Sequence, residues 1–256
     1  MLANKKIVVI GGTSGMGLSA VNAFSTAGAS VVAVGLNGED VPPQEDKKIT
    51  ILYGDARQGN TAVVAIEECL RIYGGFDGLY HVAGGSGRSF GDGPLHEMSI
   101  DGWNKTIELN LTSVMLSNQA AVKSFLHQKQ GGSILNMGSV LGVSPSPQYF
   151  STHAYAAAKA AIIGFSKSIA AYYAKQHIRV NVIAPGLVET PMAKRAAQND
   201  SIMKFIGTKQ PLDGGRIGKA NDLDGAACYF MSDAAAFATG QTLFVDGGWG
   251  ITEGQF

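Results

Sequence analysis

Residues 6–10, KIVVI, run directly into residues 11–17, GGTSGMG, and this stretch sets the fold of the chain. The first five residues form a short β-branched run, typical of a strand covered on both faces. Four glycines fall in the next seven positions, and a helical pattern begins near Leu18. A strand, a glycine turn and a helix start bring free backbone N–H groups and the positive end of a helix dipole to one point. The stretch therefore predicts a site for the pyrophosphate of a dinucleotide.

The glycine spacing bears on which nucleotide is bound. Gly11, Gly15 and Gly17 form GxxxGxG, whereas the commonest dinucleotide fingerprint is GxGxxG, and the GK(S/T) of a triphosphate loop is missing. Taken alone, the same glycines also fit a turn that packs tightly against a neighbouring segment. The residues that we expect around the phosphates are Gly11, Thr13, Ser14, Gly15, Met16 and Gly17.

Beyond this stretch, short β-branched runs alternate with longer segments of helical period, which is the pattern of βαβ units around a parallel sheet. We expect an α/β fold of the Rossmann type, a doubly wound sheet of about seven parallel strands with helices on both faces. The expected strands are 6–10, 30–34, 50–53, 78–82, 133–137, 179–183 and 242–245. The expected helices are approximately 15–27, 60–73, 101–128, 154–176 and 221–232.

Length and composition agree with one domain. The chain has 256 residues, of which 45% are apolar and only 16% charged, and this favours a well-buried protein over a disordered one. No linker, repeat or charge block divides it, so we expect residues 1–256 to form a single dinucleotide-binding and catalytic domain. The segment from about 187 to 216 has a weak pattern with several prolines and glycines. It is interpreted either as a lid over a substrate or as an ordinary surface excursion.

Charge and targeting patterns exclude several classes of protein. The 20 basic and 20 acidic side chains cancel, so no field draws nucleic acid to the chain. Cys69 and Cys228 are far apart and have no clustered histidines, which argues against a disulfide scaffold or a metal site. Glycines interrupt the apolar N-terminal stretch, and no apolar run approaches ~18 residues, so neither a secretion signal nor a membrane span is expected. We expect a cytoplasmic enzyme.

The group that contacts the adenine ribose is expected at the end of the second strand, ~20 residues after the glycines. That end is VGLN, residues 34–37, with neither the acid typical of NAD nor a cation for the 2′-phosphate of NADP. Asn37 offers hydrogen bonds to plain hydroxyls, so NAD is favoured and NADP stays open. Asp55, next to Ala56 after the third strand, is placed either to accept a hydrogen bond from the adenine amino group or to cap a helix.

A tyrosine and a lysine lie one helical turn apart at Tyr155 and Lys159. Positions i and i+4 put the phenol and the ammonium on one helix face. A phenol with a pKa of ~10 is a poor base at neutral pH, and one cation ~4 Å away supplies about the 4 kcal/mol needed to bring it near 7. This spacing predicts that Lys159 makes Tyr155 a proton shuttle, although an isolated pair of this kind also fits a surface ion pair.

Two polar residues add to this pair. Ser139 follows the strand at 133–137, and ligands gather at the carboxyl ends of parallel strands. Its hydroxyl is placed to hold a substrate oxygen beside Tyr155. Asn110 interrupts an otherwise apolar helical stretch, where a buried amide either needs outside partners or is satisfied within its own helix.

In these residues taken together, the chain resembles the short-chain dehydrogenase/reductase family in its simple single-domain form. Beyond GxxxGxG and YxxxK, the resemblance includes NVIAPG at 181–186 followed by Thr190, GRIG at 215–218, TGQ at 239–241 and VDGG at 245–248. It covers essentially the whole length of the chain. So many matches in the same order are not expected by chance.

The resemblance implies a catalytic tetrad. In such enzymes the tyrosine at Tyr155 exchanges a proton with the substrate oxygen, while the lysine at Lys159 lowers the pKa of that tyrosine and binds the nicotinamide ribose. The serine at Ser139 orients the carbonyl or alcohol, and the asparagine at Asn110 holds a water that links Lys159 to solvent. The resemblance also places at the cofactor Ala83, Gly84, Pro185, Gly186, Val188 and Thr190.

Three departures from the family pattern stand out. The usual Asn-Asn-Ala-Gly is HVAG at 81–84 here, which changes the bracing of the cofactor loop, and Ile10 replaces the threonine that commonly precedes the glycines. The segment from Ser139 to Tyr155 is longer than usual and is expected to form part of the substrate wall. His153 is placed either to touch substrate and move protons or to be a plain polar wall residue. The expected substrate contacts are Gln148, Tyr149, His153 and Met192.

The expected function is an oxidoreductase that transfers a hydride between a nicotinamide cofactor and a secondary alcohol or ketone, with Tyr155 as general acid and base. The alternatives are an NADP-dependent carbonyl reductase and a non-catalytic dinucleotide-binding regulator. No nucleic acid or membrane partner is expected. The resemblance implies a homotetramer, with residues 101–128, 154–176 and 250–256 as contact surfaces.

Overall fold

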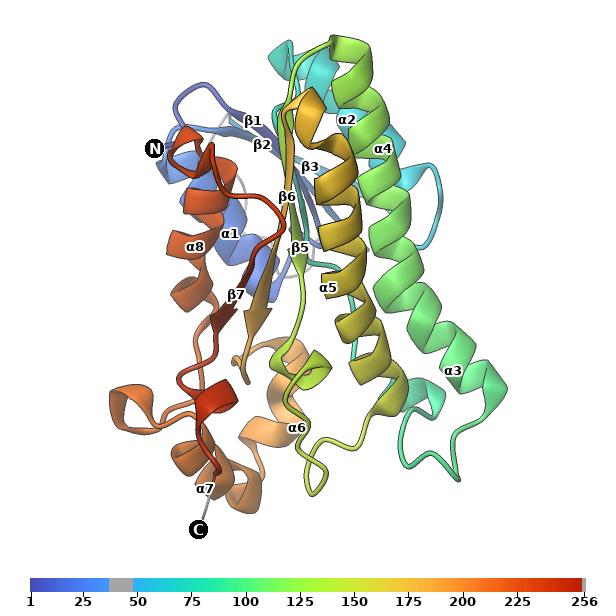
Figure 1. The fold of residues 1–256 in the computed structure, drawn as a ribbon, viewed down its shortest axis with the longest axis vertical. Coiled ribbons are helices and arrows are strands. Elements are labelled where there is room, and N and C mark those ends of the chain that lie inside the picture. Colours follow the sequence, from blue (N-terminus) through green and yellow to red (C-terminus); the bar gives the residue numbers. More distant parts are fainter. Residues whose placement is uncertain (37–47, 255–256) are drawn as a thin grey trace.

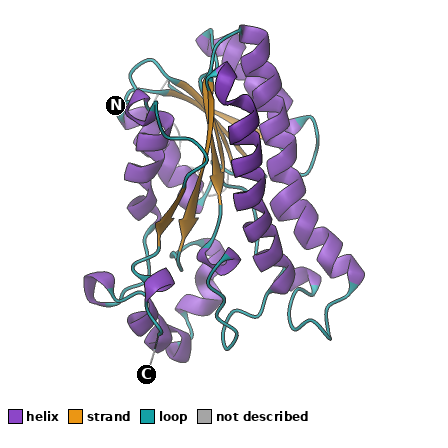
Figure 2. Ribbon diagram, in the orientation of Figure 1, coloured by secondary structure: helices purple, strands orange, loops and turns teal. Residues whose placement is uncertain are grey.

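A computed structural model describes residues 1–36 and 48–254, and in it a parallel sheet lies between two layers of helices (Figures 1 and 2). The sheet has seven strands in the order β3-β2-β1-β4-β5-β6-β7. This confirms the expected doubly wound α/β fold. The strands are β1 (Lys6–Ile10), β2 (Ser30–Gly35), β3 (Ile49–Tyr53), β4 (Gly78–His81), β5 (Gly132–Met137), β6 (Ile178–Pro185) and β7 (Thr242–Val245).

Helices cover both faces of the sheet, as Figure 1 shows. One face carries α1 (Gly15–Thr26) and α8 (Asp224–Met231), and the other carries α2 (Thr61–Tyr73), α4 (Ser113–Gln128) and α5 (His153–Tyr173). The other three α-helices of the described residues lie beyond the carboxyl ends of the strands or extend α4. They are α3 (Ile100–Ile107), α6 (Lys194–Ala197) and α7 (Asp200–Lys209).

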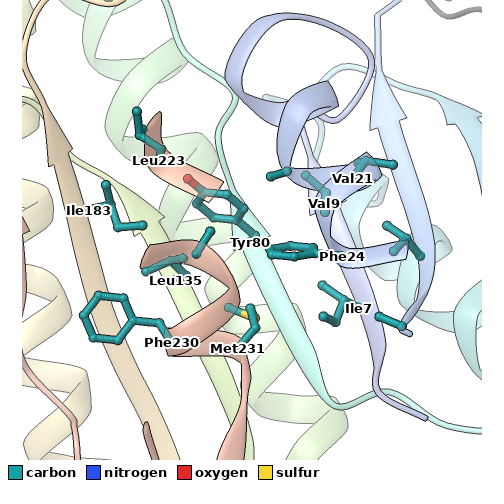
Figure 3. Close-up of a cluster of buried hydrophobic side chains, with 14 of the residues drawn as sticks. Ile7, Val9, Val21, Phe24, Tyr80, Leu135, Ile183, Leu223, Phe230 and Met231 are labelled. Atoms are coloured by element: carbon teal, nitrogen blue, oxygen red, sulfur yellow. The ribbon is translucent and has the colours of Figure 1, made fainter. Parts of the chain in front are cut away.

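The alternation of side chains along β1 divides the core into two layers. Ile7 and Val9 point toward α1 and α8, where they pack with Phe24 and Phe230 (Figure 3). Val8 and Ile10 point to the opposite face, where α2 and α4 pack against them. Because every second residue of a strand faces the same side, a run of consecutive β-branched residues fills both layers at once.

The boundaries follow the sequence closely, with two informative differences. The helix expected over 101–128 is divided into α3 and α4 by a π-helical turn at Glu108–Thr112. The segment 187–216, expected as a lid or a surface excursion, contains α6 and α7 at the lower end of Figure 1. Within the ranges that the structure describes, no helix combines the length and the apolar character needed to cross a membrane.

The strand order places an opening at the carboxyl edge of the sheet. β1 has β2 on one side and β4 on the other, so the chain leaves β1 and β4 in opposite directions. In open α/β sheets this reversal point is where ligands bind. Residues after β1, β4, β5 and β6 therefore meet around one opening.

Candidate active site

A cavity of about 990 Å³, including its open mouth, lies at this edge of the sheet. Its walls come from the glycine turn, from the loops after β4, β5 and β6, from α5 and from the 187–216 segment. The cavity brings together nine of the residues that the sequence placed at the site. They are Met16, Gly84, Ser139, Tyr155, Lys159, Pro185, Gly186, Val188 and Thr190.

The glycine turn is packed backbone against backbone. Gly11 has a φ of +86°, and a Cβ added there would lie 2.5 Å from the amide nitrogen of Ala83. A Cβ on Gly17 would lie 1.9 Å from the carbonyl oxygen of Gly11. Neither distance is possible for a real side chain, so both positions require glycine. Ala83, expected at the cofactor, packs against this turn and donates its N–H to Ile10 O at 3.0 Å.

The start of α1 has the properties of an anion site. Ser14 is the N-cap but its side chain makes no capping hydrogen bond, and the first turn holds no acidic residue. The first N–H groups of a helix have no partner within the helix, and they lie at the positive end of its dipole. A Cβ added to Gly15 would lie 3.4 Å from Thr190 Cγ2, so the turn also touches the start of the 187–216 segment. The residues present fit the pyrophosphate of a dinucleotide.

The remaining described residues expected at the cofactor do not line the cavity. Thr13 is buried against Gly35, where a Cβ would lie 1.8 Å from Thr13 Oγ1. Ser14 is exposed and Ala56 is partly buried. Asn37 lies outside the described residues, and so does the side chain of Met192. These contacts stay predictions.

Asp55 is held by a neighbouring cation. Arg57 Nη2 lies 2.6 Å from Asp55 Oδ2, and hydrogen bonding to that guanidinium lowers the pKa of the carboxyl. The alternative that Asp55 caps a helix is wrong, because α2 begins after Asn60 as its N-cap. The two groups neutralise each other at the end of β3, so Arg57 is not a free cation there.

Lys159 is buried on α5 and points toward the end of β5. Its Nζ donates to Met137 O at 2.9 Å and lies 5.5 Å from the centroid of the Tyr155 ring. Burial lowers the pKa of this ammonium to about 8, because the charged form loses its hydration. The i and i+4 spacing therefore gives the shared face that the sequence predicts, with the cation above the ring.

The pKa of Tyr155 departs from the expectation. Burial raises it above its ordinary value, while a hydrogen bond from Ser139 acts in the opposite direction. The expected lowering by Lys159 is wrong for the folded chain itself, since the ammonium faces the ring and donates to Met137 O. Ser139 Oγ accepts from Leu141 N at 3.2 Å, which orients its hydroxyl. Tyr155 is thus a protonated phenol at neutral pH.

Asn110 lies in the π-helical turn and braces the loop after β4. Its Nδ2 donates to Gly85 O at 2.9 Å, and its Oδ1 accepts from Gly85 N at 3.1 Å. Nδ2 also donates to Thr106 O at 2.9 Å, so the amide has partners both outside and inside its helix. A Cβ on Gly84 would lie 2.8 Å from Asn110 Oδ1, which explains the glycine there. The water contact implied for Asn110 stays a prediction.

His81 takes over bracing that the family pattern gives to amides. The ring is fully buried, and its Nε2 lies 3.2 Å from Ala83 O while Nδ1 lies 2.7 Å from Ser117 Oγ. A carbonyl only accepts, so Nε2 carries the proton. Burial, and then the charge of Lys159, lower the pKa of His81 to about 3, so the ring stays neutral. The changed bracing is therefore an imidazole bridge between β4 and α4.

Asp92 is a site residue that sequence reasoning missed. Its Oδ1 accepts from Ala154 N at 3.0 Å and its Oδ2 from Tyr155 N at 2.9 Å, and the residue is buried. The carboxylate thus caps α5 at the residue that carries the phenol. The sequence signal was weak, because Gly91-Asp92-Gly93 resembles an ordinary turn about sixty positions before the helix.

The outer wall of the cavity is mostly apolar and only partly matches the expected substrate contacts. Phe150 and Trp249 line it, with ring centroids 5.7 Å apart. Tyr149 packs against Phe205 behind this wall, with the ring centroids 5.0 Å apart and the rings tilted by 43°. Gln148 and His153 are exposed and do not line the cavity, so the structure does not support a substrate contact by either. The sequence also missed Arg88 and Arg195, which line the same wall.

Comparisons with known proteins agree with this geometry. The sequence model described as enoyl-(acyl carrier protein) reductase matches residues 11–250. A 2,5-dichloro-2,5-cyclohexadiene-1,4-diol dehydrogenase of Sphingobium indicum is 32% identical over 97% of this chain and 98% of its own. A 3-oxoacyl-(acyl-carrier-protein) reductase of Chlamydia trachomatis serovar D is 32% identical over the same shares.

Solved structures give the same result. A short-chain type dehydrogenase/reductase from Mycobacterium ulcerans superimposes with a TM-score of 0.88 at 26% identity, covering 99% of this chain and 92% of that one. The aldohexose dehydrogenase of Thermoplasma acidophilum has a TM-score of 0.82 at 27% identity, with 96% and 94% covered. The chain therefore belongs to the short-chain dehydrogenase/reductase family of oxidoreductases, whose dehydrogenases use nicotinamide cofactors.

Proposed function

We propose that the protein interconverts a secondary alcohol and a ketone, with Tyr155 as general acid and base. The observation that carries this proposal is one cavity in which Ser139, Tyr155 and Lys159 meet the end of β6 and the glycine turn. A bound nicotinamide would supply or accept the hydride, and the chain supplies position and the proton.

The protonation states favour Tyr155 as the donor in the direction of reduction. A phenol with a raised pKa holds its proton at neutral pH and is ready to give it to a carbonyl oxygen. After the transfer, the Ser139 hydroxyl stabilises the phenolate of Tyr155, because it donates a hydrogen bond to the phenolic oxygen. Lys159, charged below a pKa of about 8, adds a positive charge within 5.5 Å of the ring centroid.

For the cofactor, we propose NAD. A 2′-phosphate would need a cation near the end of β2, where Leu36 is exposed and apolar, and the nearby Arg57 is paired with Asp55. NADP use stays the alternative. Titration of the protein with NADH and with NADPH, followed by cofactor fluorescence, distinguishes the two; tighter binding of NADPH would reverse the assignment.

The direct test of the enzymatic proposal is Tyr155→Phe. This change removes one hydroxyl and keeps the ring, so NADH should bind with unchanged affinity while turnover of ketones falls by about 10²- to 10⁴-fold. A screen of ketones with wild-type protein comes first. If Tyr155→Phe keeps its turnover, Tyr155 is not the proton donor; if NADH binds but no ketone or alcohol reacts, the chain is a dinucleotide-binding regulator.

We propose further that the protein is a single-domain homotetramer of the cytoplasm, with residues 187–216 as a lid. The edge strand β7 presents Leu243 and Phe244, each about 40% exposed, as a surface for a second copy. Both cysteines are free, which fits a reducing compartment. Light scattering on a sizing column gives the number of copies, and a monomer would contradict the tetramer.

A further inference from the structure

The cavity carries more positive charge than the neutral chain would lead one to expect. The net charge of the protein is zero. Three cationic side chains nevertheless line the cavity, Arg88, Arg195 and Lys159, and among its described lining residues there is no Asp or Glu. Lys159 is the buried lysine beside Tyr155 and already has a role in the proposed reaction. The two arginines have no role in that reaction.

Arg88 lies in the loop after β4, and among the described residues its guanidinium makes one hydrogen bond, from Nη2 to Tyr149 O at 3.3 Å, although it has five N–H donors. Burial lowers the pKa of Arg88, and the charge of the nearby Asp92 carboxylate acts in the opposite direction. Both oxygens of Asp92 accept from the first residues of α5. Arg88 is therefore partly buried at the cavity wall, and no carboxylate of the described residues is hydrogen-bonded to it.

Arg195 lines the same cavity as Arg88. It lies on α6, and within the described part of the chain it makes no hydrogen bond or ion pair. Its charge lowers the pKa of Arg88, after the larger effect of burial, so the two guanidinium groups repel each other across the cavity. The one nearby carboxylate, Asp92, already accepts from the first residues of α5, so two like charges held together here are stabilised when an anion lies between them.

The position of this pair separates it from the phosphates of the cofactor. Those phosphates are expected at the start of α1, which the 187–216 segment touches through Thr190. Arg88 instead donates a hydrogen bond to the carbonyl oxygen of Tyr149, whose ring packs against Phe205 beside Trp249. Arg88 therefore lies at the aromatic outer wall and Arg195 lines the same cavity, where the substrate of the proposed reaction would extend from Tyr155.

We propose that Arg88 and Arg195 bind an anionic group of the substrate, a carboxylate or a phosphate, at the end remote from the reacting carbonyl. This specificity rests on the proposed oxidoreductase function. The apolar residues between the two ends, among them Phe150, Leu187 and Trp249, fit a short hydrocarbon portion. The substrate class is thus an oxo acid or an oxo phosphate ester, with the corresponding hydroxy compound as product.

Anion binding is measurable without turnover, because Trp249 lines the cavity and is one of only two tryptophans. A Trp103→Phe background makes Trp249 the sole tryptophan. The probes are hexanoate and hexyl phosphate, with hexanamide and 1-hexanol as neutral partners of the same length. We expect Trp249 fluorescence to respond to both anions at concentrations about 10- to 100-fold lower than to the neutral probes.

Single variants in the same background locate the site. Arg88→Met and Arg195→Met should each weaken hexanoate and hexyl phosphate by about 10- to 100-fold and leave hexanamide within about twofold. Arg71→Met is the matched control, since Arg71 is an exposed arginine on α2 that does not line the cavity, and it should bind like the parent. The ratio of the affinities for hexanoate and hexyl phosphate shows whether the site prefers a carboxylate or a phosphate.

Two further measurements keep this inference separate from the proposed reaction. NADH affinity should change by less than about twofold in Arg88→Met and Arg195→Met, because the arginines do not serve the cofactor. In turnover, 4-oxopentanoate and 5-oxohexanoate should exceed their methyl esters in kcat/KM by about 10-fold or more, and Arg88→Met should abolish that preference. If anions bind as expected but no oxo compound is turned over, the anion site stands and the oxidoreductase proposal fails. Three outcomes would overturn the anion site. The wild-type site could bind hexanoate and hexanamide equally, or the arginine variants could lose affinity for NADH and keep their affinity for hexanoate. The enzyme could also turn over the oxo acids and their methyl esters equally well.

Discussion

The two walls of the cavity are built by different means. The glycine wall, Gly11–Gly17, consists of backbone segments in contact, and its shape depends on missing side chains at Gly11 and Gly17. The tyrosine wall, formed by α5 and the loops after β4 and β5, depends on buried polar groups that reach across the fold. Asp92 holds the start of α5, and Lys159 reaches Met137 O.

The difference teaches where each wall is vulnerable. Close backbone contact has no alternative arrangement, so a single added carbon forces the glycine wall apart. On the tyrosine wall the buried ammonium of Lys159 reduces stability, because burial removes water from its charge, and it is retained for chemistry. We therefore expect substitutions to destabilise the first wall and, at one position, to stabilise the second.

The largest effect is expected at the glycine wall. Gly17→Ala places a Cβ 1.9 Å from Gly11 O, a backbone atom that cannot move without opening the turn. We expect the free energy of unfolding to fall by about 3 kcal/mol and NADH affinity to fall at least about 100-fold. Urea denaturation and a fluorescence titration measure the two quantities. Wild-type affinity would show that the turn does not hold the cofactor.

On the tyrosine wall, Lys159→Met should stabilise the protein while removing activity. Burial lowers the pKa of Lys159 from 10.5 to about 8, so the unfolded chain binds the proton more tightly. The resulting loss of stability, about 3 kcal/mol, is fully present below pH 8 and disappears as the pH rises toward 10.5. The variant also loses the hydrogen bond to Met137 O, which costs about 1 kcal/mol. Its free energy of unfolding at pH 7 should therefore exceed that of the wild type by about 2 kcal/mol.

Urea denaturation of wild type and Lys159→Met at pH 7 and pH 10 tests the sign. The stability of the wild type should rise relative to the variant over this interval, since its lysine loses its charge there. A difference that does not change with pH would mean that the ammonium is hydrated in the folded state.

A smaller effect is expected from Asp92→Asn. An amide accepts through one oxygen only, so either Ala154 N or Tyr155 N loses its partner. We expect a loss of about 1 to 2 kcal/mol in the free energy of unfolding and a fall in kcat, with NADH affinity unchanged. Ser99→Ala is the matched control, because it removes the cap of α3, where Ser99 Oγ accepts from Gly102 N at 3.0 Å. If both variants keep full kcat, Asp92 is only a structural cap.

The smallest effect should be a gain at Gly164 on α5. A Cβ added there meets nothing within 4 Å, and the residue is exposed. Gly164→Ala should therefore raise the free energy of unfolding by about 0.5 to 1 kcal/mol through helix propensity, with activity unchanged. Thermal denaturation measures it. A loss of stability would mean that another copy of the chain packs against this face of α5.

The same contrast explains how far the sequence could predict the structure. β1 and the glycine turn were predictable because their signals are local in the sequence: a β-branched run, then clustered glycines just before a helical pattern. Asp92 was missed because its partners lie on α5, about sixty residues away, and no spacing rule links them. The predicted lowering of the Tyr155 pKa was wrong, because the i and i+4 spacing does not reveal that the phenol is buried. It also does not reveal that the Lys159 ammonium donates its hydrogen bond to the carbonyl oxygen of Met137.

The π-helical turn at Glu108–Thr112 has a consequence for how the chain can change in length. Such a turn contains one residue more than an α-helical turn, so it is in effect an insertion into the helix. Deleting a single residue there would restore regular α-helical winding and remove the widened turn that presents Asn110. Asn110 would then lose its contact with Gly85, whereas a deletion between α6 and α7 would leave that contact in place.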